Sequence, residues 1–192
     1  MTKTETRKYV RERLLKISDA EREWASGAIL DELTSLDVFK NAKSIFIFLG
    51  TQTEPDTEEL IGLALAMEKT VSVPKISGDT MDAILISPFT DFRRNKYGIL
   101  EPDKGQIVRE FDLCILPLVA FCGLNRLGHG KGYYDKFLEN NSCFKLGIAF
   151  DCQGVDSIET TSQDIPLDML VTEGRVISAC GVSSANTFGE NL

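Results

Sequence analysis

The sequence has little histidine and no paired-cysteine motif, and these shortages exclude several kinds of catalytic site. His129 is the one histidine among 192 residues. A Ser-His-Asp triad or a Cys-His dyad would have to use it, and a two-histidine metal site is excluded. The 5 cysteines are odd in number and form no C-x-x-C pair, so neither a disulfide framework nor a zinc site is expected. We therefore expect chemistry carried by carboxylates, cations and backbone amides.

Long apolar runs and an excess of positive charge are also missing. No apolar stretch approaches the ~18 residues of a membrane span, and the start, MTKTETRKYVRERLL, lacks the apolar centre of a secretion signal. Lys and Arg number 21 against 29 Asp and Glu, a net charge of −8. Binding to a nucleic-acid backbone needs a basic face. We expect a cytoplasmic protein with no membrane or nucleic-acid partner, in which any phosphate ligand needs local cations.

Helix-type and strand-type patterns alternate along the chain. Predicted helices start near residue 3, after a capping box at Ser18, at Thr57 and at Tyr133. Predicted strands cover residues 44–49, 70–74, 81–86, 112–121 and 144–150, followed by a small hairpin of 170–172 and 175–178. The alternation predicts one α/β domain over residues 1–192, with an open, mostly parallel sheet flanked by helices in three layers. Residues 182–192 are expected to form a flexible tail.

The first predicted helix carries two cations on its apolar face. Val10, Leu14 and Ile17 recur at helical spacing, and the same period reaches back to Arg7 and Lys3. On sequence alone we favour a frayed first turn with both charges solvated. The alternative is that both side chains meet an anion.

The main chemical signal is the run Arg126-Leu127-Gly128-His129-Gly130-Lys131-Gly132-Tyr133-Tyr134-Asp135. Alternating glycines allow positive φ and close approach to a ligand, and successive amides can form an anion-binding nest. A helix that begins near Gly132 would add its dipole, and Arg126 and Lys131 add two cations. The run matches neither G-x-x-x-x-G-K-[ST] nor G-x-G-x-x-G. Glycine spacing alone leaves a tight strand-to-helix turn at least as well supported as a phosphate cradle.

The residues after the glycines have two interpretations each. Asp135 falls in the first turn of the predicted helix, and on position alone we favour a role in complementing the helix dipole. The functional alternative is a magnesium ligand beside phosphates. Tyr133 and Tyr134 point roughly 100° apart in a helix, so only one is expected to pack inward, and the other is free to stack on a flat ligand.

The run from Pro117 to Leu138 resembles the signature of the 5-formyltetrahydrofolate cyclo-ligase (5,10-methenyltetrahydrofolate synthetase) family, R-L-G-x-G-x-G-Y-Y-D. The resemblance covers roughly residues 3–178. Its supporting elements are Lys3-x-x-x-Arg7, the strand and loop through Leu49 and Glu54, Glu101-Pro102, and the region with Gln153, Asp164, Asp168 and Thr172. The chain departs from the family pattern at Leu118, at Cys122 and in the short segment from Phe121 to Arg126, which is expected to reshape the wall of the loop.

This resemblance implies an enzyme that uses ATP and Mg²⁺ to convert 5-formyltetrahydrofolate to 5,10-methenyltetrahydrofolate, ADP and phosphate. The formyl oxygen would be phosphorylated, and nitrogen 10 would then close the ring. The implied ATP-binding residues are Lys3, Arg7, Arg126, Leu127, Gly128, His129, Gly130, Lys131, Gly132, Tyr133 and Tyr134. The implied folate-binding residues are Leu49, Glu54, His129, Gly130, Lys131, Gly132 and Tyr133. Asp135 and Asp164 would bind Mg²⁺, and Arg126, Lys131 and Tyr133 would be catalytic.

Other expectations follow from the same resemblance. His129 occupies the variable position of the motif and is expected to be a loop or ligand contact, not a catalytic base. The fold should resemble that of sugar-phosphate isomerases and CoA-transferases, and the protein should be a monomer or weak homodimer acting on folates with or without a polyglutamate tail. A non-catalytic folate or nucleotide binder on the same fold is the alternative, suggested by the altered segment from Phe121 to Arg126. An isomerase or transferase relative, active without ATP, is a weaker one.

Overall fold

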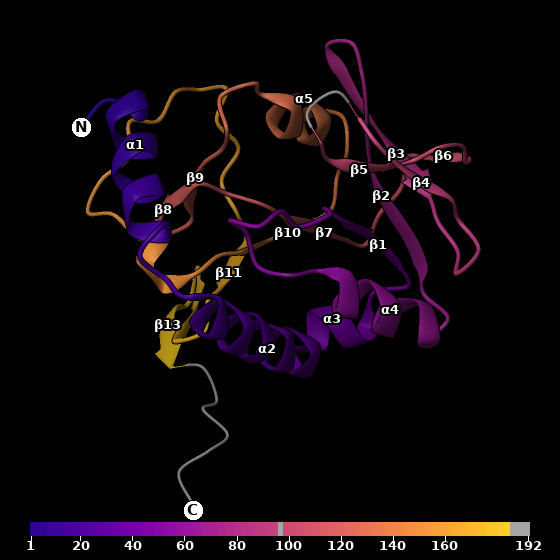
Figure 1. The fold of residues 1–192 in the computed structure, drawn as a ribbon, viewed down its shortest axis with the longest axis horizontal. Helices are drawn as coiled ribbons and strands as arrows, with labels where there is room; N and C mark the ends of the chain where they lie inside the picture. Colours follow the sequence, from indigo (N-terminus) through magenta and orange to yellow (C-terminus); the bar gives the residue numbers. More distant parts are fainter. Residues whose placement is uncertain (96–97, 185–192) are drawn as a thin grey trace, which may run out of the picture.

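The computed structural model of the protein describes residues 1–95 and 98–184 (Figure 1). The helices are α1 (Lys3–Leu14), α2 (Asp19–Ser35), α3 (Asp37–Asn41), α4 (Glu58–Ala66), α5 (Tyr133–Glu139) and the 3-10 turn η1 (Asp151–Gln153). The strands are β1 (Ser44–Ile47), β2 (Thr70–Ser77), β3 (Thr80–Leu85), β4 (Phe92–Arg94), β5 (Leu100–Pro102), β6 (Ile107–Val108), β7 (Leu113–Leu116), β8 (Ala120–Cys122), β9 (Asn125–Leu127), β10 (Phe144–Ile148), β11 (Met169–Val171), β12 (Arg175–Ser178) and β13 (Gly181–Ser184).

Within this part of the chain, one large sheet has the order β13-β12-β11-β10-β7-β1-β2-β3-β6. Its centre, from β11 to β2, is parallel, and antiparallel strands extend both edges. Two small antiparallel pairs, β4-β5 and β8-β9, stand apart from it. The expected open, mostly parallel α/β sheet is confirmed.

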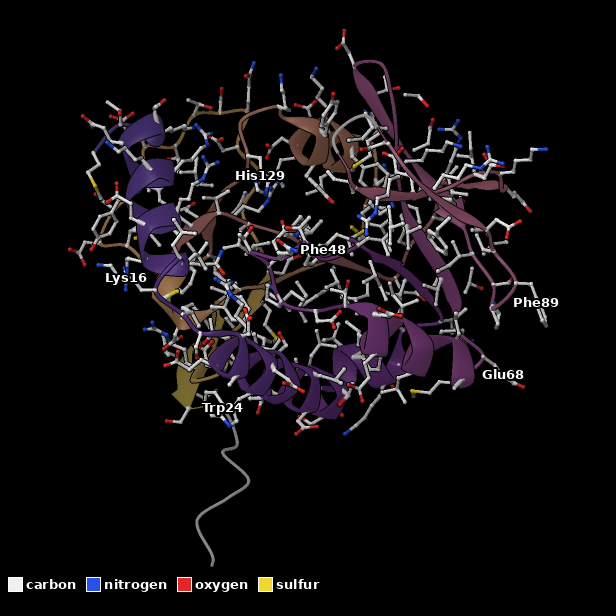
Figure 2. The ribbon with its side chains drawn as sticks, viewed as in Figure 1. Lys16, Trp24, Phe48, Glu68, Phe89 and His129 are labelled. Atoms are coloured by element: carbon white, nitrogen blue, oxygen red, sulfur yellow. The ribbon has the colours of Figure 1, made fainter. Side chains whose placement is uncertain are left out.

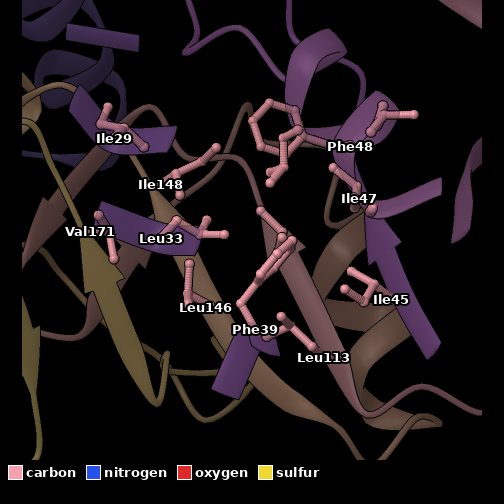
Figure 3. Packing of buried hydrophobic residues seen from close by; sticks show 14 of the residues in the cluster. Ile29, Leu33, Phe39, Ile45, Ile47, Phe48, Leu113, Leu146, Ile148 and Val171 are labelled. Atoms are coloured by element: carbon pink, nitrogen blue, oxygen red, sulfur yellow. The ribbon is translucent and has the colours of Figure 1, made fainter. Parts of the chain in front are cut away.

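The two faces of this sheet are covered by different helices, which gives three layers. Figure 1 shows α2, α3 and α4 along one face and α5 on the other. Along β1, Ile45 and Ile47 join the core beneath α2–α4, whereas Phe46 joins the core beneath α5. Figure 3 shows the first core, where Leu33 and Phe39 of α2 and α3 are fully buried. Because successive side chains alternate between faces and both faces are covered, the central strands are continuous apolar runs.

Local signals placed most of the helices correctly. The Ser18 hydroxyl accepts from the amide of Glu21, whose carboxylate accepts from the Ser18 amide, so the expected capping box opens α2. A second box, between Thr2 and Glu5, opens α1. The expectation of a frayed first turn is therefore wrong. None of the helices in the described residues combines the length and apolar character needed to cross a bilayer.

The predicted strand of residues 112–121 is two strands. β7 ends at Leu116, because Pro117 has no N–H to donate to a ladder. The chain then forms the tight hairpin β8-β9, in which Cys122 pairs with Asn125 and Gly123 takes a φ of 56°. A glycine with positive φ at the first central position suits a two-residue hairpin turn.

The expected tail begins later than predicted. Residues 182–184 belong to β13, which pairs with β12 from Arg175–Ser184 to Ser178–Gly181. Residues 185–192, the remainder of the predicted tail, lie outside the described residues.

Candidate active site

A cleft of about 760 Å³ opens where the carboxyl ends of β1 and β7 meet. The chain leaves β1 toward β2 on one side of the sheet and leaves β7 toward β10 on the other, so the two connections diverge at this point. Such switch points are where open α/β sheets bind ligands. Every site residue expected from the sequence lines this cleft: Lys3, Arg7, Leu49, Glu54, the whole run from Arg126 to Asp135, and Asp164.

The glycine loop, residues 128–132, crosses the cleft between β9 and α5. Gly130 has a φ of 95° and Gly132 a φ of 68°, conformations that favour glycine. Within the described part of the chain, the amides of residues 128–131 donate no hydrogen bond. The loop therefore offers a set of unengaged N–H groups, as an anion nest requires.

The two cations of α1 meet the body of the protein. Arg7 Nε donates to the carbonyl of Gly128 at 2.8 Å, and a Cβ at Gly130 would lie 3.2 Å from Arg7 Cζ. Lys3 Nζ lies 2.6 Å from Asp164 Oδ2. The interpretation of both charges as solvated is thus wrong, since each is held at the cleft by a named acceptor.

Arg126 is buried beneath the loop and paired with Asp135. The Arg126 side chain is 2% exposed, and its Nη2 lies 2.7 Å from Asp135 Oδ1, which also accepts from the amide of Ile165. Burial lowers the pKa of Arg126, and the charge of Asp135 opposes that shift. Arg126 Nε has no partner among the described residues. Asp135 thus does more than complement the dipole of α5.

The position of α5 is set by aromatic packing. Phe137 stacks on Phe46 of β1 with 4.7 Å between ring centroids, which fixes the helix on the sheet and Asp135 above Arg126. Tyr134 packs inward near Phe46, and burial raises its pKa, with the charge of Glu54 acting in the same direction. Tyr133 instead donates from its hydroxyl to the carbonyl of Gly78 at 3.1 Å, in the turn between β2 and β3. The two tyrosines therefore diverge, as expected.

Glu54 lies on the loop after β1, opposite the glycine loop. Its Oε2 accepts from the amide and hydroxyl of Thr51 at 3.0 and 2.7 Å. Its Oε1 lies 3.2 Å from His129 Nε2. Figure 2 shows His129 in the space between α1 and α5, on the side that faces Phe48 at the end of β1.

One wall of the cleft is not predicted from the sequence. Ile76, Met81 and Ile99 form an apolar side, and Glu101 reaches it from β5. Glu101 Oε1 accepts from the amide of Ile76 at 3.0 Å and from Asn95. Strands are expected at residues 70–74 and 81–86, but nothing local shows that they pair as a hairpin or that this hairpin borders the site. Phe121 and Cys122, where the chain departs from the family pattern, are not among the described residues that line the cleft.

The acidic groups offer a partial set of metal ligands. Among residues 1–95 and 98–184, no three His, Cys, Asp or Glu side chains gather into a metal-binding group. Asp164 is engaged, since its Oδ2 accepts from Lys3 and Thr161 and its Oδ1 from Lys3. Burial opposes ionisation of Asp164, but the hydrogen bonds from Lys3 and Thr161 outweigh it and lower its pKa. Asp135 Oδ2 accepts from no described residue, and one or two carboxylates suffice for Mg²⁺ when phosphate oxygens supply other ligands.

The sequence resembles those of known enzymes along most of its length. Residues 1–173 match the profile of the 5-formyltetrahydrofolate cyclo-ligase family. The chain is 32% identical over 195 residues to a probable 5-formyltetrahydrofolate cyclo-ligase of Caenorhabditis elegans, covering 91% of this chain and 94% of the relative. It is 30% identical over 184 residues to the 5-formyltetrahydrofolate cyclo-ligase of Haemophilus influenzae, covering 88% and 98%.

Solved structures show the same fold. The NMR structure of 5,10-methenyltetrahydrofolate synthetase from Aquifex aeolicus superposes with a TM-score of 0.81 at 32% identity, covering 100% of this chain and 96% of that one. A synthetase structure from Mycoplasma pneumoniae gives a TM-score of 0.73 at 22% identity, covering 90% and 99%, and supports the fold alone.

Proposed function

Because this chain belongs to the 5-formyltetrahydrofolate cyclo-ligase family, we propose that it converts 5-formyltetrahydrofolate and ATP to 5,10-methenyltetrahydrofolate, ADP and phosphate. One observation carries the proposal: a single cleft holds a glycine loop with free amides, cations from α1, and acids on both sides. Cations and amides suit a nucleotide phosphate, and an acidic group beside an apolar wall suits the pterin.

The formyl oxygen is a poor leaving group, so it must be activated before the ring can close. The formyl oxygen attacks the γ-phosphorus of ATP, the bond from that phosphorus to the β-γ bridging oxygen breaks, and ADP leaves. Nitrogen 10 then attacks the activated formyl carbon and loses its proton, and the carbon–oxygen bond breaks to release phosphate. A protein assists such a transfer mainly by positioning the reactants and neutralising charge.

The phosphate end of the cleft would be bound by α1 and the loop. Lys3, Arg7 and Lys131 supply cations, and the amides of residues 128–131 supply donors. Lys131 is exposed, and it would neutralise charge that develops on the γ-phosphoryl group. Arg126 is almost completely buried, so it acts mainly by orienting Asp135.

Mg²⁺ would be held chiefly by Asp135. Asp135 lines the cleft, Arg126 holds its Oδ1, and its Oδ2 has no hydrogen-bond partner among the described residues. Asp164 would serve as a second ligand by giving up part of its contact with Lys3. The ion would neutralise phosphate charge and orient the transferred group.

The folate end would be bound on the opposite side. Glu54 would accept hydrogen bonds from donors of the pterin ring, Leu49 would pack against the ring, and Tyr133 would border the formyl group. The apolar side formed by Ile76 and Met81 would cover the rest of the folate.

The test is near-UV absorbance of the methenyl product, recorded with 5-formyltetrahydrofolate and Mg²⁺, with and without ATP. An ATP-dependent rise supports the proposal. A rise without ATP would instead favour an isomerase or transferase relative. Tight binding of both ligands with no product would favour a non-catalytic homologue, and failure of both to bind would refute the proposal.

A further inference from the structure

The apolar wall at the folate end of the cleft is built by two pairs of strands that belong to different sheets. Ile76 of β2 and Met81 of β3 are register partners in the large sheet. Ile99 comes from the chain just before β5, in the small β4-β5 pair, which shares no strand with the large sheet. All three residues line the cleft, so the shape of this wall depends on how the two pairs are joined.

The carboxylate of Glu101 joins the two pairs. β2 pairs with β1 from Thr70 to Ser72, and farther along β2 the amide of Ile76 donates to Glu101 Oε1 at 3.0 Å. The same oxygen accepts from Asn95 Nδ2 at 2.9 Å. Asn95 Oδ1 in turn accepts from the amide of Ile99 at 3.1 Å. One carboxylate oxygen therefore connects the backbone positions of Ile76 and Ile99.

A second contact holds the same two strands together without touching the wall. β5 lies against β2 (Figure 1), and Lys75 Nζ donates to the carbonyl of Asp103, the residue after β5, at 2.6 Å. Side chains alternate along a strand, so Lys75 and Ile76 point to opposite faces of β2. Lys75 is accordingly not among the described residues that line the cleft. Loss of the Glu101 contact would leave β5 attached to β2 but would release the spacing between Ile76 and Ile99.

We propose that Glu101 is a positioning residue, which holds Ile76 and Ile99 at a fixed spacing and so sets the apolar surface on which the rings of the folate pack. This inference rests on the proposed function, in which the folate binds at this end of the cleft. Dispersion contacts weaken steeply when a gap opens between two surfaces, so a wall that shifts binds the rings less tightly. The wall covers the ring system and not the reacting groups. Its loss should therefore weaken ground-state and transition-state binding alike, which raises KM without lowering kcat.

The experiment compares Glu101→Met with Glu101→Gln, two substitutions of similar length that both remove the negative charge. Glutamine keeps an oxygen that accepts from Ile76 and Asn95, whereas methionine keeps no strong acceptor. The measurements are the Kd for 5-formyltetrahydrofolate, by calorimetric titration without ATP, and KM and kcat in the absorbance assay. In Glu101→Met we expect the Kd and KM for folate to rise about tenfold, with kcat and the KM for ATP changed less than about twofold. In Glu101→Gln all four values should stay within about twofold of native.

Lys75→Met is the matched control, since it removes another contact between β2 and the chain after β5. It should lower the free energy of unfolding in urea about as much as Glu101→Met does, and leave the Kd for folate unchanged. Glu101→Asp, which keeps the charge but shortens the reach to Ile76, is the second variant if Glu101→Met does not fold. It should weaken folate binding in the same direction as Glu101→Met, while Glu101→Gln does not.

Three results would overturn the inference. Equal weakening in Glu101→Gln and Glu101→Met would mean that the carboxylate contacts the folate directly, through Oε2, which accepts from no described residue. A native Kd in folded Glu101→Met would mean that the contact does not shape the wall. An equal rise of Kd in Lys75→Met would mean that any attachment of β5 suffices. Folate binding without turnover in the native protein would refute the proposed reaction alone, since the Kd comparison still stands, and absence of folate binding would refute both.

Discussion

Arg126 Nη2 lies 2.7 Å from Asp135 Oδ1, with the arginine almost wholly buried and the carboxylate side chain 25% exposed. Both residues line the cleft, and the printed contacts of Asp135, with Arg126 and with the amide of Ile165, are all made by Oδ1. Asp135 neutralises a buried charge, and in the proposed function it would also present its second oxygen to the metal ion.

Replacing Asp135 should cost both stability and activity. In Asp135→Asn the Arg126 charge is left buried without its counter-ion, and we expect unfolding free energy to fall by about 1–3 kcal/mol. We expect turnover with Mg²⁺ to fall about 100-fold or more. Urea unfolding and the absorbance assay measure the two effects. The double variant Arg126→Met/Asp135→Asn should recover stability but not turnover; recovery of turnover would contradict the role of Asp135 as a ligand.

The Lys3–Asp164 pair should add stability with a defined pH dependence. The pKa of Asp164 is lowered in the folded state, because hydrogen bonds from Lys3 and Thr161 outweigh the effect of burial. Its stabilising contribution is therefore complete above the ordinary aspartate pKa of about 3.9 and is lost as pH falls through the lower folded value. We expect Lys3→Met to be about 0.5–1 kcal/mol less stable than native at pH 7, and the difference to shrink at pH 2.5. Lys16→Met, an exposed lysine (Figure 2), serves as the control. A difference that persists at pH 2.5 would argue against this coupling.

Gly130 should tolerate alanine less well than Gly123. Both have positive φ, but a Cβ at Gly130 would lie 3.2 Å from Arg7 Cζ, whereas a Cβ at Gly123 would meet nothing within 4 Å. Both variants carry backbone strain of about 1–3 kcal/mol, and only Gly130→Ala should displace Arg7 and raise the KM for ATP, by about tenfold. Steady-state kinetics with varied ATP test this, and equal KM values in the two variants would contradict it.

Tyr133→Phe should loosen the hairpin that borders the folate end. The hydroxyl contact with Gly78 ties α5 to the turn between β2 and β3. Loss of this hydrogen bond removes about 1 kcal/mol. We expect faster amide exchange at residues 77–80 and a KM for folate about three- to tenfold higher. A fall in kcat with unchanged KM and exchange would place the hydroxyl at the reacting formyl group instead.

The parts of the site that could be predicted are those coded locally. The alternating glycines are visible in a short window. Glu54 alone looks like an ordinary loop acid and is singled out only by the family resemblance, with which the rule that ligands bind at the carboxyl ends of parallel strands agrees. The capping box at Ser18 is equally local. These features need no knowledge of how distant segments pack.

The features that could not be predicted depend on distant segments. Nothing near Lys3 shows that Asp164 will meet it, so the sequence favours a solvated charge, which the contact between the two side chains shows to be wrong. Glu101 lies on a three-residue strand whose partner is equally short, too little for an alternating pattern to be recognised. The sequence does not show that a strand ends before Pro117, because apolar residues continue on both sides of this proline. The two strands are separate because the chain after Pro117 forms the β8-β9 hairpin.

The contact between Lys3 of α1 and Asp164 forms late during synthesis on the ribosome, because the two residues lie far apart in the sequence. Lys3 leaves the ribosome well before its partner, which follows 161 residues later. At roughly 5–20 residues per second, α1 waits about 8–32 s for that carboxylate to be synthesised. The ion pair between Lys3 and Asp164 at the cleft therefore forms only after residue 164 has been synthesised. A nascent chain that stalls before residue 164 carries the glycine loop and the Arg7 contact with it, but it lacks the carboxylate that holds Lys3.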